Sequence, residues 1–122
     1  MRSVVVLRLS LVAVLALATG CSSNKGKIEG TKWTSQAATV KGKPVIAGFV
    51  QLEFTKDDKV TLKRDTDTFT GSYSLGMSST VTLHLDQELS GSKIHAEKIV
   101  ITGDTLTMTD YDGTQISFQR AK

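Results

Sequence analysis

The sequence is short of cysteine, histidine and aromatic residues. Its 122 residues include one cysteine and two histidines, and 6% of them are aromatic. A single cysteine excludes an internal disulfide, on which many small exported domains depend, so packing alone must stabilise the fold. Two histidines provide few ligands for a zinc site, which needs three or four. The scarcity of aromatic rings argues against a glycan-binding surface, because sugars usually stack on such rings.

Basic clusters are also absent, although the formal net charge is +3. The nearest candidate, Lys63-Arg64, is followed immediately by Asp65 and then by Asp67. A protein that binds nucleic acid carries its basic residues as a patch or stripe on one face. We therefore expect no nucleic-acid partner.

The one long apolar run covers residues 4–18 and is interrupted by Arg8. It is shorter than the ~20 apolar residues that a membrane-spanning helix requires. With Arg2 before it and Ala-Thr-Gly-Cys ending at Cys21 after it, the segment resembles a bacterial lipoprotein signal peptide. The resemblance implies a helical signal peptide, residues 1–20, that is cleaved off, and a diacylglycerol on the thiol of Cys21. Two alternatives stay open: an uncleaved membrane anchor, and a secretory signal that leaves a free thiol.

A lipid on Cys21 implies attachment to a membrane of the bacterial cell envelope. Ser22, in place of aspartate, favours the outer membrane facing the periplasm, by resemblance to the enterobacterial sorting rule. Loss of the two arginines of the leader lowers Lys+Arg from 15 to 13, against 12 Asp+Glu, so the formal charge falls to +1. Residues 21–27 are polar, and we expect a lipidated tether that reaches about 20 Å at most. Residues 28–122 are long enough for one domain with one core.

Apolar and polar residues alternate with period two through most of residues 28–122, as in residues 50–54, and no segment has the apolar spacing of a long helix. We expect a first strand over residues 31–39. Turn signals separate the runs, and Asp112-Gly113 suits a two-residue hairpin. The prediction is an all-β fold of about eight short antiparallel strands in an up-and-down meander, closed into a small barrel that leaves no free sheet edge.

The order of several short motifs carries a family resemblance. Gly30-Thr31-Lys32-Trp33 opens the domain, and further pieces follow at Phe69–Tyr73, Gly103–Met108 and Tyr111–Thr114. This series resembles the small lipocalin-like lipoproteins, often paralogous and uncharacterised, of planctomycete-type bacteria, and it covers nearly the whole domain. It is similar, more weakly, to META-type domains. The resemblance implies a lipocalin-like barrel but no function, because a fold does not determine function.

Candidate catalytic and metal-binding residues are few. His84 is expected on the solvent face of its strand, whereas His95 and Glu97 are two residues apart and could share a strand face. That pair alone would be an incomplete metal site. Asp110 and Asp112 are best explained as turn residues, and neither a nucleophile motif nor a phosphate-binding loop is present. The sequence predicts no enzyme activity, no catalytic residue, no metal and no cofactor.

Large side chains are expected to fill the barrel and to leave little cavity, because eight strands enclose little more than their inward side chains. They are Leu52, Phe54, Leu62, Phe69, Tyr73, Leu83, Leu85, Ile101, Met108 and Phe118. Trp33 and Tyr73 are the candidates for a ligand mouth, although both are better explained as ties for strand ends. Rows of threonine and serine on the outer wall, such as Thr68 and Thr70, could contact peptidoglycan, but threonine also simply suits exposed strands.

Three functions are compatible with these observations. The first is a lipid-anchored structural or protein-interaction module of the cell envelope, monomeric, with an envelope protein or peptidoglycan as partner. The second is a carrier that binds a lipid or a small hydrophobic ligand in the barrel mouth. The third is an inhibitor of an envelope enzyme.

Overall fold

The computed structural model describes residues 22–110 and 112–121, and within them the protein is all-β, with ten strands. The predicted signal peptide, residues 1–20, and Cys21 lie outside the described residues. The strands are β1 (Thr31–Ser35), β2 (Ala38–Val40), β3 (Lys43–Val45), β4 (Val50–Phe54), β5 (Lys59–Arg64), β6 (Asp67–Leu75), β7 (Thr80–Leu89), β8 (Ser92–Thr102), β9 (Thr105–Thr109) and β10 (Gln115–Arg120).

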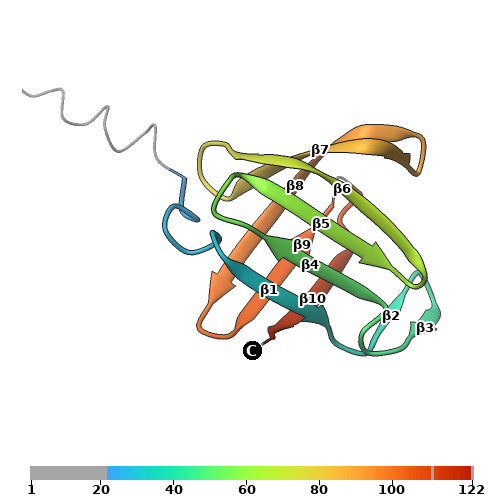
Figure 1. Cartoon of the computed structure of the whole chain (residues 1–122). Helices are drawn as coiled ribbons and strands as arrows, with labels where there is room; N and C mark the ends of the chain where they lie inside the picture. The colour runs from blue at the N-terminus through green and yellow to red at the C-terminus, as the bar shows by residue number, and fades with distance from the viewer. Residues whose placement is uncertain (1–21, 111, 122) are drawn as a thin grey trace, which may run out of the picture.

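Eight of these strands form a closed antiparallel barrel in the order β1-β10-β9-β8-β7-β6-β5-β4 (Figure 1). Each strand from β4 to β9 pairs with the next one along the chain. β1 closes the ring, because it pairs with both β4 and β10. The prediction of an eight-stranded up-and-down barrel is therefore confirmed.

The remaining strands, β2 and β3, form a separate hairpin between β1 and β4. This hairpin corrects the prediction of a single strand over residues 31–39, because β1 ends at Ser35 and β2 begins at Ala38. Ser35 is buried, its carbonyl accepts the N–H of Gly48 at 2.7 Å, and its hydroxyl accepts the N–H of Val50 at 3.0 Å. These bonds tie the end of β1 to the start of β4, so the chain between them leaves the barrel wall as a hairpin.

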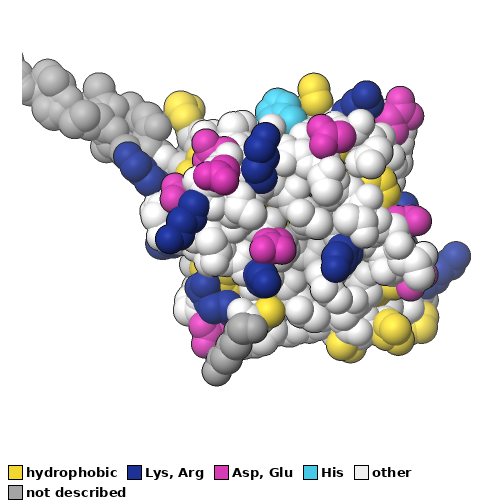
Figure 2. Space-filling view, viewed as in Figure 1, with side chains coloured by type: hydrophobic (Ala, Val, Ile, Leu, Met, Phe, Trp, Pro, Cys, Tyr) yellow, Lys and Arg dark blue, Asp and Glu magenta, His cyan; other side chains and the backbone are white. Residues whose placement is uncertain are grey.

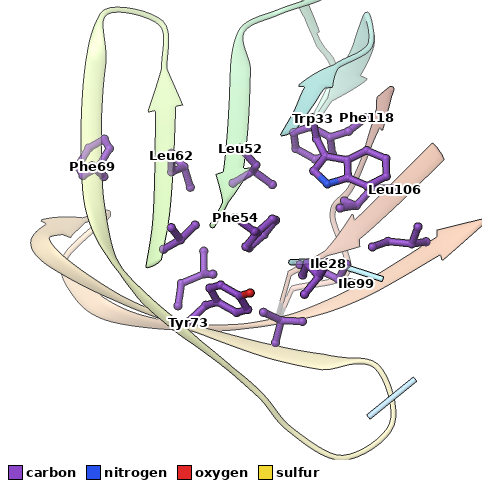
Figure 3. Close-up of a cluster of buried hydrophobic side chains, with 14 of the residues drawn as sticks. Ile28, Trp33, Leu52, Phe54, Leu62, Phe69, Tyr73, Ile99, Leu106 and Phe118 are labelled. Atoms are coloured by element: carbon purple, nitrogen blue, oxygen red, sulfur yellow. The ribbon is translucent and has the colours of Figure 1, made fainter. Parts of the chain in front are cut away.

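Period-two alternation places one face of every barrel strand inside. On β4, Leu52 and Phe54 are buried, while Gln51 between them is exposed. Figure 3 shows the labelled side chains of this cluster gathered inside the barrel. The rings of Phe54 and Tyr73 meet edge to face, with centroids 5.0 Å apart, a geometry that stabilises beyond the area buried. Of the side chains predicted inside, all are buried except Met108, which is half-buried.

The two ends of the barrel differ, and we call them the base and the rim. The base carries residues 22–30, which precede β1, together with the β4–β5, β6–β7 and β8–β9 turns. The rim carries the β2–β3 hairpin and the β5–β6, β7–β8 and β9–β10 connections. In Figure 1 the base is on the left, where the blue segment leads into β1, and the β2–β3 hairpin is at the lower right.

Gly71 on β6 marks a close approach of two backbones. A Cβ atom at this position would lie 2.1 Å from the carbonyl oxygen of His84 and 2.7 Å from the Cα of Leu85 on β7. Immediately beyond His84, the pairing of β7 with β8 is irregular up to Leu89. The absence of a side chain at Gly71 therefore lets the backbones of β6 and β7 approach closely at this point.

The β9–β10 connection is longer than the two-residue hairpin predicted at Asp112-Gly113. The N–H of Asp110 donates to the carbonyl of Thr114 at 3.0 Å, and the N–H of Gly113 donates to the carbonyl of Asp110 at 3.0 Å. Gly113 has a φ of +87°. This is a three-residue loop with glycine in the left-handed position that such loops require. The Asp112-Gly113 dipeptide correctly predicted where the chain turns. The loop is closed by Asp110 and Thr114, so it starts one residue earlier than a two-residue hairpin would.

Candidate functional site

The segment before β1 is docked on the base. Ser22 forms a β-bridge with Ser78 of the β6–β7 turn, and the N–H of Ser23 donates to the carbonyl of Ser78 at 2.7 Å. Asn24 is buried, and its Nδ2 donates to the carbonyl of Ile99 at 3.0 Å. Ile28 is fully buried in the core. Residues 22–24 are thus bound to backbone groups of the base, whereas Lys25, Gly26 and Lys27 are exposed.

Trp33 and Tyr73, the two candidates for a ligand mouth, are core residues. The indole Nε1 of Trp33 donates to Thr31 Oγ1 at 2.8 Å, and the guanidinium of Arg120 lies 4.5 Å from the ring. The hydroxyl of Tyr73 donates to the carbonyl of Thr55 at 3.3 Å. Burial raises the pKa of Tyr73, and negative charge nearby raises it further. Both polar atoms bond to residues at strand ends on the side of the base. These bonds fit the interpretation of Trp33 and Tyr73 as ties for strand ends.

The histidines and Glu97 lie where the alternation placed them. His84 is exposed on the outer face of β7, whereas His95 and Glu97 both face inward on β8. The Nε2 of His95 is 2.8 Å from the carbonyl of Ser92. Only 9% of Glu97 is exposed, and no described group lies within hydrogen-bonding distance of its Oε1. Burial raises the pKa of Glu97 to about 7, with smaller contributions from the negative charges of the β9–β10 loop.

The β9–β10 loop brings two more carboxylates to the rim. Asp110 and Asp112 are joined through the N–H of Asp112, which donates to Asp110 Oδ1 at 3.0 Å. Asp112 Oδ2 also lies 2.8 Å from Lys41 Nζ on the β2–β3 turn. The hydrogen bond from the Asp110 carboxyl, followed by the bonds from Lys41 and Thr114, lowers the pKa of Asp112 below its usual range. These contacts fasten the hairpin to the rim.

These acidic residues do not form a metal centre. Within residues 22–110 and 112–121, no group of three or more His, Cys, Asp or Glu side chains is arranged to hold a metal ion. His95 and Glu97 share a strand face, as the sequence indicated, but they remain an incomplete pair. The most distinctive feature of Glu97 is therefore its buried and unpartnered oxygen.

A pocket that the sequence did not predict lies at the rim, between the β2–β3 hairpin and the barrel. Its volume is about 160 Å³. It is lined by Ser35, Gln36, Ala38, Val40, Val45, Phe49, Val50, Arg64 and Ile116. The apolar lining comes from both hairpin strands and from the inner face of β4 and β10. Neither Trp33 nor Tyr73 belongs to it, so this pocket is distinct from the mouth considered from the sequence.

Arg64 is the one charged residue of the pocket. It continues the inward alternation of Val60 and Leu62 on β5, it is half-buried, and its guanidinium lies 5.8 Å from the ring centre of Phe69. In the described part of the chain the ion pairs are Lys32–Glu53, Lys41–Asp112 and Arg120–Asp104, and Arg64 belongs to none of them. From the sequence, Arg64 was considered only as a member of the short basic pair Lys63-Arg64. The alternation of β5 was the signal that would have placed it inside.

Exposed hydrophobic side chains lie at both ends of the barrel. Ile46, next to β3, is 75% exposed, and Met77, next to Ser78 in the base, is 66% exposed. Figure 2 shows hydrophobic side chains gathered at the lower right, over the β2–β3 hairpin. The predicted rows of threonine and serine are on the outer wall, where for example Thr70 Oγ1 donates to Asp86 Oδ2 at 3.1 Å.

Comparisons with known proteins give no assignment. No protein-family model matches the chain, and the comparison with curated proteins finds no significant match. The resemblance to lipocalin-like lipoproteins therefore stays a prediction that rests on the residues quoted above. Among the residues that the structure describes, none forms a helix with the length and hydropathy of a membrane span.

Proposed function

We propose that this protein is a lipid-anchored β-barrel of the bacterial cell envelope, and that it acts as a non-catalytic module that binds another protein. The observation that carries the proposal is the docking of residues 22–24 on the base. Ser22, the residue that follows Cys21 in the sequence, is bridged to Ser78 of the β6–β7 turn, so a lipid on Cys21 would attach the chain at the base. The base would face the bilayer and the rim would face away from it.

Two features of the base and the core support this arrangement. Met77 precedes Ser78, the residue bridged to Ser22, and is 66% exposed. With a lipid on Cys21, this apolar side chain would also face the membrane surface. The barrel interior is filled by large side chains, including Trp33 and Phe54, each about 1% exposed or less. A filled interior favours an interaction module over a carrier, because small-molecule sites usually enclose about 300–1,000 Å³.

The test uses the full-length chain expressed in a Gram-negative bacterium and labelled with an alkyne analogue of palmitate. We expect the wild-type protein to carry the label, to lose residues 1–20, and to sediment with membranes. Cys21→Ala should abolish the label and membrane association through lipid. Ser22→Ala, its neighbour, is the matched control and should keep both. A wild-type protein that carries no lipid, or a Cys21→Ala variant that is still processed and sediments as before, would overturn the proposal.

A further inference from the structure

We propose that the rim pocket is the docking site for a segment of a partner protein that inserts one large hydrophobic side chain next to a carboxylate. The inference deepens the proposed function, on which it rests for the orientation of the barrel. It names the chemistry of the partner and the residues that recognise it.

The size of the pocket selects a single side chain. Its volume of about 160 Å³ is well below that of a usual small-molecule site. A dry apolar cavity of about 150 Å³ is large enough for a benzene molecule. The pocket therefore has room for the ring of a phenylalanine or for a branched aliphatic group, and too little room for a whole acyl chain. Pockets of this kind receive the anchor residues that contribute most of the binding energy of protein interfaces.

Arg64 supplies the polar half of the recognition. Arg64 is half-buried at the wall of the pocket, its guanidinium lies 5.8 Å from the centre of the Phe69 ring, and it makes no ion pair with a described residue. Asp67, its register partner on β6, is exposed. A guanidinium held in this way presents a planar fork that a carboxylate can occupy with two hydrogen bonds. Charge complementarity therefore points to an acidic group beside the apolar anchor.

The surroundings of the pocket suit a protein partner. Ile46, the most exposed of the large hydrophobic residues in the described chain, follows β3, and Val40 and Val45 of the hairpin are only half-buried. A partner segment crossing the hairpin would cover these side chains while its anchor enters the pocket. The rim also lies at the opposite end of the barrel from Ser22, where the chain begins its contact with the base. An approaching protein would thus meet the rim without obstruction by the membrane.

The probe is a capped hexapeptide, Thr-Thr-Phe-Asp-Thr-Thr, added to the full-length protein in lipid nanodiscs with labelled isoleucine and valine methyl groups. We expect binding to shift the methyl resonances of Val45 and Ile116, which line the pocket. Replacing the phenylalanine of the peptide with alanine, or its aspartate with lysine, should weaken binding about tenfold or more. Arg64→Gln should have the same effect as the lysine peptide, and Lys63→Gln, which alters the exposed neighbour, should leave binding unchanged.

Two further measurements keep the inference falsifiable. In the Ala38→Trp variant, the indole should fill the pocket and abolish the peptide-induced methyl shifts while Arg64 is still present. An unchanged circular dichroism spectrum would show that this variant is folded. Hexanoate is the probe for a small amphiphile. If hexanoate shifts the pocket methyl groups and the peptide does not, the occupant is not a protein segment and the inference is wrong. Absence of shifts with the peptide at millimolar concentration also overturns it. Neither result would affect the lipidation test, so the two proposals fail separately.

Discussion

Replacing Glu97 with glutamine should stabilise the protein at pH 8 and change its stability little at pH 4.5. Glu97 is 9% exposed, its Oε1 has no partner among the described residues, and burial raises its pKa from 4.5 to about 7. A pKa that is higher in the folded than in the unfolded state means that folding favours the protonated acid. The stability contributed by this acid is complete below about pH 4.5 and is lost as the pH rises from there to 7.

The size of the effect follows from the pKa. A rise from 4.5 to about 7 corresponds to at most about 3.4 kcal/mol, at 1.36 kcal/mol for each pKa unit. The secondary contributions come from Asp110 and Asp112 in a loop at the solvent-facing rim, where water and salt screen their charges. We therefore expect Glu97→Gln to be about 1–2 kcal/mol more stable than the wild type at pH 8. Glutamine keeps the shape of the acid and also places a donor in the site.

The measurement is urea unfolding of residues 22–122, followed by the fluorescence of Trp33, the only tryptophan of the chain. Glu88→Gln is the matched control, because Glu88 is exposed on β7 and its replacement should change stability by less than about 0.5 kcal/mol at either pH. If wild type and Glu97→Gln lose stability equally between pH 4.5 and pH 8, the carboxyl is not the group that titrates. If Glu97→Gln is less stable at pH 8, the carboxylate is ionised and satisfied, and the reasoning fails.

Two core substitutions test the packing of the barrel. Gly71→Ala should cost about 3 kcal/mol or more, because its Cβ would lie 2.1 Å from the carbonyl oxygen of His84. Gly42→Ala, at a φ of +81° with open space around it, should cost only about 1–2 kcal/mol, and equal urea midpoints for the two variants would contradict the close approach. Leu83→Ala should cost ~2–5 kcal/mol by leaving a cavity, whereas Thr82→Ala on the outer face should cost under about 1 kcal/mol. A reversed order of these two in thermal denaturation would show that the inward face of β7 is misassigned.

Most of the barrel could be predicted from the sequence because the strands and turns are determined by residues that are close together in the chain. Alternation along each strand determines which side chains face inward, and turn signals such as Asp112-Gly113 determine where the strands reverse. Residues 50–54 illustrate this, since Leu52 and Phe54 are buried and Gln51 is exposed as their order requires. Antiparallel neighbours from β4 to β10 then follow from short connections, whereas closure of the barrel depends on the pairing of β1 with β10, which joins distant residues such as Trp33 and Arg120.

The β2–β3 hairpin was missed because its decisive contacts are not local. β2 and β3 have three residues each, too few to show a period. β1 ends where Ser35 accepts hydrogen bonds from the N–H groups of Gly48 and Val50, which lie more than ten positions further along the chain. The pocket was missed for the same reason, because it exists only where this hairpin folds against the rim. Arg64 could have been found from the alternation of β5, had the inward face been followed to the end of the strand.

Where the chain begins its contact with the barrel determines which surfaces can meet a partner. A free polar tether would let the domain turn, so that any face could be presented. Ser22 and Ser23 instead bind Ser78, and Asn24 binds Ile99, so the base is fixed to the residue that follows Cys21. A lipid on that cysteine would then hold the β6–β7 turn at the bilayer, and the hairpin with its pocket would project from the other end. The proposed lipid anchor and the proposed docking site would thus use different surfaces of the barrel.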